Sequence, residues 1–183
     1  MNAALDEFAE KGFDGARIQD IADRAGVNKQ LIAYYFGGKE GLYQEVQRSW
    51  PEIEAEFADP ALPLDEVAVR YLSAGLADTR PARLMIWRGL TGNDTDIDDD
   101  ETTVEADLAN LRHAQERGEI AADLDPAFVR MAVMGMVLAP VMLPRTILRS
   151  TGTEPGSPEF EHYCREQLRR LMRHLAAPDT PGK

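Results

Sequence analysis

The chain contains one cysteine, Cys164, and lacks any apolar run long enough to cross a membrane. A single cysteine forms no internal disulfide, so a secreted disulfide-rich scaffold and a cysteine-based zinc finger are both excluded. The longest nearly uninterrupted apolar run covers residues 131–144, and a membrane-spanning helix needs roughly 20 residues. Arg130 and Arg145 close this run at either end. We therefore expect a buried helix here.

A signal peptide is also missing from the N-terminus. Asp6, Glu7 and Glu10 stand where a secretory signal has basic residues followed by an apolar stretch. The composition, 44% hydrophobic and 28% charged over 183 residues, is typical of a folded soluble protein. We expect a cytoplasmic location.

Positive charge is scarce: the net charge is −12 and the sequence pI is about 4.7. Taken alone, this balance argues against nucleic acid as a partner, because phosphate binding needs cations. The acidity is uneven, however. Residues 1–50 hold six basic and eight acidic side chains, a net of −2, so most of the negative charge lies beyond them. The charge of the whole chain is therefore a poor guide to the N-terminal segment.

The sequence predicts an all-α fold, because apolar residues recur at three- and four-residue spacing and alternating strand patterns are missing. Three short helices are expected before residue 37, with ends at Gly12, Gly26 and Gly37. A longer helix starts near Lys39 and includes Trp50, Pro51, Ile53 and Phe57. Further helices are expected at 64–77, 81–90, 102–118, 126–143 and 158–177. The total is about nine helices, with an acidic exposed connection at 91–101, a loop at 150–157 and a frayed tail from 178.

Two of the short helices flank the sequence Gly26-Val27-Asn28. Glycine adopts the left-handed conformation that ends a helix sharply, and asparagine caps the start of the next helix. Ala22 is small where the two helices would cross, and Val27 and Ile32 would fill the angle between them. This pattern predicts a helix-turn-helix, whose second helix enters the DNA major groove.

Five sequence blocks carry a family resemblance. They are Phe-Ala-Glu-Lys-Gly-Phe at 8–13, Asp-Ile-Ala at 20–22, Ala-Gly-Val at 25–27, Tyr-Tyr-Phe at 34–36 and Lys-Glu-Gly-Leu-Tyr at 39–43. In order and spacing they resemble the N-terminal domain of TetR-type transcriptional regulators. The segments 124–128 and 157–160, each opening a later helix, resemble one branch of the family's ligand-binding domains. The resemblance implies a DNA-binding domain over 1–46 and a helical ligand-binding and dimerisation domain over 47–183.

The resemblance also implies roles for single residues. The third helix would present Lys29, Gln30 and Tyr34 to the groove, and Lys39 would meet a phosphate at the start of the fourth helix. Tyr35, Phe36 and Leu42 are expected in the core. The candidate DNA-binding residues are Arg17, Asn28, Lys29, Gln30, Tyr34 and Lys39.

The larger domain is expected to bind a small molecule and to dimerise. Methionine and aromatic side chains form adaptable apolar walls, although the same residues commonly form a plain core. The candidate ligand-binding residues are Tyr71, Met85, Trp87, His113, Phe128, Met131 and Met134. The resemblance implies that two of the later helices form a two-fold four-helix interface, although plain core packing would explain the same residues. The candidate dimer-interface residues are Ala132, Gly135, Ala139, Tyr163, Leu168, Leu171 and Met172.

Metal and catalytic chemistry find little support. Asp94, Asp96, Asp98, Asp100 and Glu105 have the spacing of an EF-hand, but Asp99 stands where that loop needs glycine. His162, Cys164 and His174 do not share one side of a helix, so a zinc site is not expected. The sequence has no glycine-rich phosphate loop, no Gly-x-Ser-x-Gly and no His-Glu-x-x-His. We expect no metal, no cofactor and no enzymatic activity.

These observations predict a ligand-responsive repressor that binds a near-palindromic DNA operator as a homodimer and is released by a small-molecule inducer. One alternative is a helical small-molecule- or protein-binding dimer whose helix-turn-helix no longer reads DNA. Three observations favour that alternative. The positive charge is low, Ala33 stands where a tyrosine is common in the family, and two residues precede the first helix. A small helical enzyme is the second alternative, and it lacks a paired catalytic constellation.

Overall fold

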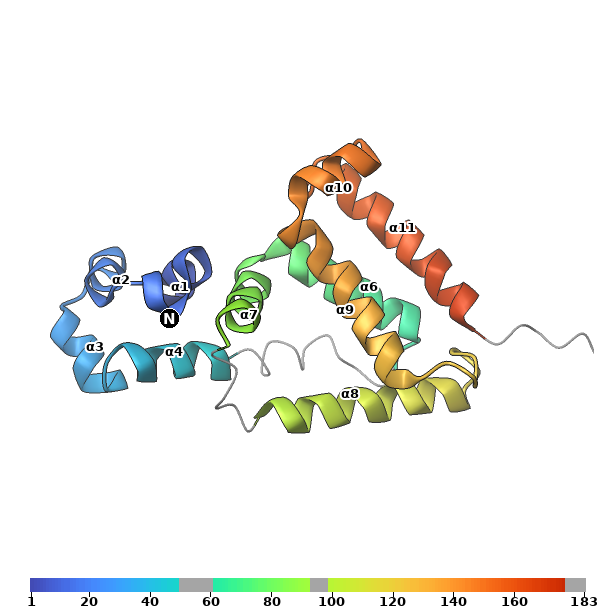
Figure 1. Ribbon diagram of the computed structural model, residues 1–183, viewed down its shortest axis with the longest axis horizontal. Coiled ribbons are helices and arrows are strands. Elements are labelled where there is room, and N and C mark those ends of the chain that lie inside the picture. The colour runs from blue at the N-terminus through green and yellow to red at the C-terminus, as the bar shows by residue number, and fades with distance from the viewer. Residues whose placement is uncertain (50–60, 93–98, 177–183) are drawn as a thin grey trace, which may run out of the picture. The chain divides into compact units, whose positions relative to one another are not determined.

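The computed structural model describes residues 1–49, 61–92 and 99–176, with the backbone alone for 99–102. Within these ranges the chain forms ten helices and no strands, which confirms the all-α prediction (Figure 1). The helices are α1 (Asn2–Gly15), α2 (Ile18–Ala25), α3 (Lys29–Phe36), α4 (Lys39–Arg48), α6 (Leu64–Ala77), α7 (Arg80–Thr91), α8 (Asp99–Glu116), α9 (Pro126–Met142), α10 (Pro144–Thr151) and α11 (Pro158–Leu175). Among the described residues no single helix is long and apolar enough to cross a membrane; α9 and α10 together are, but they are bent by 99°.

The helices form two compact units that interleave along the sequence. The first unit contains α1 to α4 together with α7, and the second contains α6 and α8 to α11. The chain therefore leaves the first unit after α4, returns to it for α7, and leaves it again. Helix α7 lies beyond residue 46, where the sequence places the boundary between DNA-binding and ligand-binding domains, yet it packs with the N-terminal helices.

The first unit is built around Phe8, which is fully buried. Ala22 from α2, Ile32 from α3 and Leu42 from α4 join it in one cluster, and Leu84 brings α7 into the same core. The Tyr43 ring meets the Phe8 ring edge-on, with 4.9 Å between centroids. Burial of these side chains supplies the main favourable term that holds the short helices together, since helices of eight to ten residues are marginal alone.

The second unit has two adjoining apolar clusters. In the first, Ala68, Val69 and Leu72 of α6 pack against Leu168 and Met172 of α11, with α9 residues at the margin. The second cluster joins α8, the following loop and α9, and its buried members are Leu111, Ala114, Ile120 and Val129. Helix α6 is thus the element that α11 covers, while α8 packs against α9.

Most helix bounds agree with the sequence. Helix α6 has the predicted bounds, and α2 and α3 end at Gly26 and Gly37, both left-handed. The Asp125 carboxylate accepts the N–H groups of Ala127 and Phe128 at the start of α9. Several sequence-based expectations lie outside the described residues: those for Trp50, Pro51, Ile53 and Phe57, for most of the connection 91–101 and for the tail from 178.

Two expectations for residues 126–157 are wrong. Helix α10 was not predicted, and the apolar run 131–144 is divided between α9 and the start of α10. This run is also not buried. Within α9 the buried residues are Val129 and Pro140, while Met131 is 60% exposed. One side of an almost wholly apolar helix is therefore uncovered in the single chain.

Candidate DNA-binding surface

The turn between α2 and α3 is fixed by its own backbone and by one side chain. Gly26 has φ 67°, and the N–H of Val27 donates to the Ala22 carbonyl at 3.0 Å. The Asn28 Oδ1 then accepts the backbone N–H of Gln30 at 3.0 Å, which caps α3. Both features were predicted, and they set the angle at which α3 leaves the turn.

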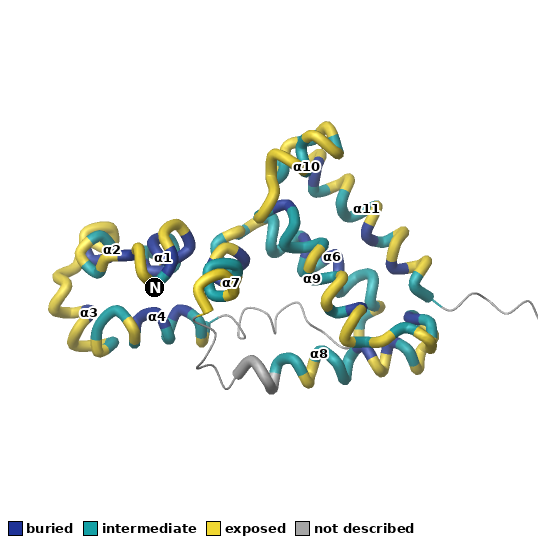
Figure 2. Tube along the Cα trace, in the orientation of Figure 1, coloured by how far each residue is buried: buried dark blue, intermediate teal, exposed yellow. Residues whose placement is uncertain are grey.

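Helix α3 exposes nearly all of its surface (Figure 2). Ile32 is its single buried residue, whereas Lys29, Gln30 and Leu31 are exposed and Tyr34 is 80% exposed. A helix held by one narrow strip is free to present its remaining side chains to a partner. The N-terminal residues of such a helix are those that meet base edges in a helix-turn-helix.

Two core assignments near this helix are wrong. Tyr35 was expected in the core but is 71% exposed, and its ring meets the Tyr34 ring edge-on at 5.1 Å. Val27 was expected to fill the angle between α2 and α3 but is 41% exposed. The α3 strip that reaches the core carries Ile32 and the half-buried Phe36, four residues apart, and Tyr35 lies to one side of it. These apolar groups enlarge the exposed surface instead.

Lys39 has partners within the chain. Its Nζ donates to the Asp14 carbonyl at 3.3 Å and lies 4.6 Å from the centre of the Phe13 ring. The ammonium thus joins the start of α4 to the end of α1, and it keeps two further N–H donors. The predicted phosphate contact at Lys39 stays a prediction. A substitution of Lys39 would disturb packing as well as charge.

Gly41 fixes the approach of α4 to α3. A Cβ placed on this residue would lie 1.8 Å from the Phe36 carbonyl oxygen, so any side chain would force the helices apart. The block at 39–43 thereby has a steric requirement beyond its charge. This close approach holds the base of the exposed helix.

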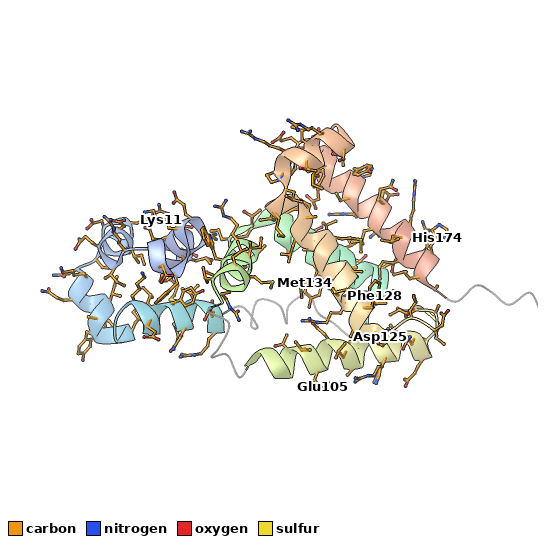
Figure 3. The ribbon with its side chains drawn as sticks, viewed as in Figure 1. Lys11, Glu105, Asp125, Phe128, Met134 and His174 are labelled. Atoms are coloured by element: carbon orange, nitrogen blue, oxygen red, sulfur yellow. The ribbon has the colours of Figure 1, made fainter. Side chains whose placement is uncertain are left out.

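Three of the six cations of residues 1–48 are paired with the chain's own carboxylates. Lys11 lies within 4.0 Å of Glu7 and Asp20, Arg24 of three acids on α1, and Arg48 of Glu45 (Figure 3, where Lys11 is labelled). Within the described part of the chain, the side chains of Arg17 and Lys29 form no ion pair or hydrogen bond, and both are exposed. They are the cations of α1 to α4 that are free to meet phosphates.

Asp6 on α1 bridges two arginines. Arg80 Nη1 of α7 donates to its Oδ1 at 2.6 Å, and Arg24 Nη1 of α2 lies 3.4 Å from its Oδ2. The Arg80 hydrogen bond, aided by Arg24, lowers the pKa of Asp6 from its ordinary value, and burial opposes this only in part. The same contacts, with Asp78 first, raise the pKa of Arg80. Asp6 is therefore ionised throughout the neutral range.

Helix α7 packs along α1, which sequence reasoning missed. Gly12 has φ 70° and ψ 176°, and a Cβ there would lie 3.0 Å from the Trp87 ring. Arg83 Nε donates to the Ala9 carbonyl at 3.0 Å. The sequence places a helix end at Gly12; in the structure this residue kinks α1, which continues to Gly15. A glycine at this position indicates that another side chain approaches the helix closely, but the sequence does not identify which residue that is.

The predicted ligand-binding residues fall in both units. Met85 and Trp87 belong to the first, where the Trp87 ring lies against Gly12. Tyr71, His113, Phe128, Met131 and Met134 belong to the second. Phe128 and Met134 both come from α9 (Figure 3), where Phe128 is 59% exposed and Met134 half-buried. His113 is exposed on α8, so a buried polar anchor is not provided by this residue.

The predicted dimer residues divide into two groups. Leu168 and Met172 are buried against α6 within one chain, and their assignment to the dimer interface stays a prediction. Tyr163 and Leu171, on the same helix α11, are 43% and 40% exposed. On α9, Ala132 and Gly135 are exposed and Ala139 is half-buried. Phe128 and Met131 share that side of α9, because residues three, four and seven apart lie on one helix face.

The metal sites rejected on sequence gain nothing from the structure. No group of three or more His, Cys, Asp or Glu side chains could hold a metal ion among the residues that are described. Asp94, Asp96 and Asp98 of the EF-hand-like pattern lie outside them. Burial raises the pKa of the Cys164 thiol, which disfavours the reactive thiolate.

A helix-turn-helix with an exposed second helix, followed by a larger helical unit, defines a class of two-domain DNA-binding transcriptional regulators. Two family models place the chain within that class. Residues 1–46 match the bacterial regulatory proteins of the tetR family, and residues 63–173 match the tetracyclin repressor-like C-terminal domain. The chain belongs to the TetR family of transcriptional regulators.

Individual proteins agree with this assignment. The HTH-type transcriptional repressor SCO4008 of Streptomyces coelicolor is 30% identical, over 94% of this chain and 92% of its own. The regulator RutR of Escherichia coli is 50% identical over 48 residues, 26% of this chain and 23% of its own. The crystal structure of SCO4942 from Streptomyces coelicolor has a TM-score of 0.77 at 26% identity, covering 96% of this chain and 94% of that one. KstR2 of Mycobacterium tuberculosis, with a TM-score of 0.70 at 18% identity over 97% and 93% of the two chains, shows the fold alone.

Proposed function

We propose that the protein is a homodimeric repressor that binds a near-palindromic operator and is released from it by a small-molecule inducer. The observation that carries the DNA-binding half is helix α3, which is capped by Asn28 and exposes Lys29, Gln30 and Tyr34. The similarity to SCO4008, which is named a repressor, supports repression over activation. A repressor of transcription acts where the chromosome is, so the cytoplasm of a bacterium is its expected location.

Each exposed residue of α3 has a distinct role in this proposal. Gln30 reads a base edge, since a glutamine amide pairs with adenine through two hydrogen bonds. Lys29 and Arg17 meet phosphates, which position the protein without reading sequence. Tyr34 reaches a phosphate or a thymine methyl group. In the dimer the two α3 helices enter successive major grooves about 34–36 Å apart.

The uncovered side of α9 supports dimerisation. Phe128 and Met131 are 59% and 60% exposed, and Ala132 and Gly135 continue the same apolar side with small residues that let another helix approach. Contiguous exposed apolar surface of this kind marks an interaction site. Tyr163 and Leu171 add exposed apolar side chains from α11. A second copy of the chain is the partner that this side of the second unit would bind.

The inducer would bind in the second unit, with Tyr71 and Met134 as the half-buried candidates for its walls. Phe128 and Met131 are better assigned to the dimer side of α9. An inducer lowers operator affinity only by its preference for the conformation that does not bind DNA. Ligand that binds tightly and leaves operator affinity unchanged would contradict this half of the proposal.

The test is a selection from random DNA followed by affinity measurements on the selected duplex. Gln30→Ala should relax specificity at one base pair of each half-site and cost roughly 1–3 kcal/mol per contact. Lys29→Gln should weaken binding to all sequences alike. Arg112→Gln removes an exposed cation from α8, where Arg112 pairs with Glu105 at 2.9 Å, and serves as the matched control with unchanged affinity.

The dimer is tested in the same preparation by light scattering coupled to gel filtration. Phe128→Asp should shift the protein toward the monomer and reduce operator affinity, because a carboxylate would be buried in the interface. Leu90→Asp changes an apolar side chain of α7 that is 75% exposed, and it should leave the mass unchanged. If the wild type, Phe128→Asp and Leu90→Asp all have the same mass in solution, then Phe128 of α9 does not lie in the dimer interface.

One observation favours the alternative of a binding module that no longer reads DNA. Four of the six cations of α1 to α4 are held by groups of the chain itself. A protein from which selection recovers no sequence, although it dimerises normally, would establish that alternative.

A further inference from the structure

The helix-turn-helix exposes a group of large apolar and aromatic side chains between residues 27 and 35. They are Val27, which is 41% exposed, Leu31 at 46%, Tyr34 at 80% and Tyr35 at 71%. None of them belongs to the apolar cluster of the first unit. Apolar surface that is gathered in one place and left in water marks a site that binds a partner.

Leu31 lies on the side of α3 that points away from the core. Successive side chains of a helix are about 100° apart, so Tyr34 is opposite the strip formed by Ile32 and Phe36. By the same spacing Gln30 and Leu31 lie on either side of Tyr34. Both belong to the first turn of α3, whose side chains meet base edges in a helix-turn-helix.

The charges beside this apolar surface indicate the chemistry of its partner. Lys29 precedes Leu31 by two residues and Arg17 is the N-cap residue of α2; both are exposed and without an ion pair or hydrogen bond among the described residues. An apolar protein surface would leave these cations unpaired. The DNA major groove offers phosphates at its rim and, on its base edges, one apolar group, which is the C5 methyl of thymine.

We propose that Leu31 is a specificity-determining residue that packs against the C5 methyl group of a thymine in each operator half-site. This inference rests on the proposed DNA-binding function and deepens it by naming a base that the operator contains. Gln30 supports the choice of base, since a glutamine amide pairs with adenine in the same groove where the thymine of an A·T pair shows its methyl. The contact region of each half-site is therefore expected to contain A·T pairs.

The size of the effect follows from the apolar surface removed from water. Leu31 keeps 46% of its surface exposed in the free protein, so a methyl group can still bury part of it. Burial of one methyl-sized group changes an affinity by about fourfold, which gives about 15-fold for the two half-sites of a dimer. A change of this size is measurable by fluorescence anisotropy.

The test replaces thymine by deoxyuridine in the selected operator, one position at a time and in both half-sites. Uracil keeps every hydrogen-bonding group of thymine and lacks only the methyl, so a loss of affinity reports the packing alone. At one thymine position the wild-type protein should lose about 15-fold in affinity. At that position Leu31→Ala should bind the thymine and uracil duplexes within about twofold of each other, because its interaction with the methyl is already lost.

Two further variants are controls. Leu90→Ala truncates a leucine of α7 that is 75% exposed, and it should keep the full sensitivity to uracil. Tyr34→Ala removes the neighbouring side chain on the same face of α3 and should also keep the sensitivity. All three truncated side chains are exposed, so the circular dichroism spectra should match that of the wild type.

The outcomes separate this inference from the proposed function. Sequence-selective binding that tolerates uracil at every position overturns the role of Leu31 and leaves the proposed function intact. A sensitivity that survives in Leu31→Ala and disappears in Tyr34→Ala also overturns it, because Tyr34 then meets the methyl. A lower mass of Leu31→Ala in solution would place Leu31 between two copies of the chain instead. A wild-type protein that selects no sequence overturns the proposed function, and this inference with it.

Discussion

At the scale of single residues, Glu7 is the one charged side chain that is buried among the described residues, with 1% of the residue exposed. Lys11 Nζ donates to its Oε1 at 2.5 Å, and Arg24 lies 3.9 Å from its Oε2. The Glu7 hydrogen bond is the largest influence that raises the pKa of Lys11. A buried carboxylate needs such partners, because transfer of an unpaired charge out of water is costly.

Replacement of Glu7 should therefore destabilise the first unit. Glu7→Gln replaces the carboxylate that pairs with Lys11 and Arg24 by a neutral amide. We expect a loss of about 1–3 kcal/mol in the free energy of unfolding. Glu10→Gln is the matched control, since Glu10 also faces Arg24 but its side chain is 59% exposed. Urea denaturation followed by circular dichroism compares the two, and equal midpoints would show that the Glu7 pair contributes nothing net.

The errors at this scale have a common cause. Helix α3 carries apolar residues at 31, 32, 35 and 36, which cover more of its circumference than its neighbours can bury. Periodicity identified the helix, but it could not decide which sector faces the core and which faces a groove. Tyr35 and Val27 were assigned to the core because they are apolar, but both are exposed on the surface that is proposed to bind DNA. Ile32 and Leu42 were correctly assigned to the core, because each lies on the side of its helix that faces the other helices of the first unit.

At the scale of helices, the contact of α7 with α1 depends on Gly12. Its φ of 70° and ψ of 176° lie in a region that only glycine adopts readily, and the Trp87 ring occupies the space of a side chain. Gly12→Ala should cost about 1–3 kcal/mol through backbone strain alone. Gly89→Ala on α7, where a Cβ meets nothing within 4 Å, should be neutral or stabilise the helix by roughly 0.5–1 kcal/mol. Urea midpoints of the two variants on the same side of the wild type would contradict the packing described here.

The sequence predicted elements better than it predicted their partners. The bounds of α6 followed from its apolar spacing between Pro63 and the turn at Asp78. Helix α10 was not predicted, because its two large apolar residues, Ile147 and Leu148, are adjacent and give no three- or four-residue repeat. The packing of α7 against α1 was not predicted for another reason. An apolar face indicates that a helix is covered, but nothing in the spacing identifies what covers it, and α7 follows α6 directly in the chain.

At the scale of the whole molecule, the acidic charge limits how the protein can hold DNA. Arg17 and Lys29 are the cations of α1 to α4 without a partner among the described residues, which gives four in a dimer. Each phosphate contact contributes about −0.9 to the slope of log affinity against log salt. We expect a slope of about −4 for operator binding, and Lys29→Gln should make it shallower by about 2 per dimer.

Fluorescence anisotropy over a series of potassium chloride concentrations measures this slope. The Arg112→Gln variant controls for the change in net charge and should keep the wild-type slope. A slope near about −9 would show that Lys11, Arg24 and Lys39 leave their present partners when DNA binds. A shallow slope with strong sequence preference would mean that base contacts, and not phosphate contacts, supply most of the specific affinity.

The interleaving of the two units has a practical consequence for chimeric regulators. If residues 1–46 alone were transferred to another regulator, Asp6, Gly12 and Phe8 would move with them. Their contacts on α7, which are Arg80, Trp87 and Leu84, would be left behind. The host's own α7 would then meet a foreign α1, with a mismatched ring at the kink. Exchange of operator specificity therefore requires a discontinuous graft, in which residues 80–91 are transferred with the N-terminal helices although they lie within the segment 63–173 that matches the C-terminal domain of the family.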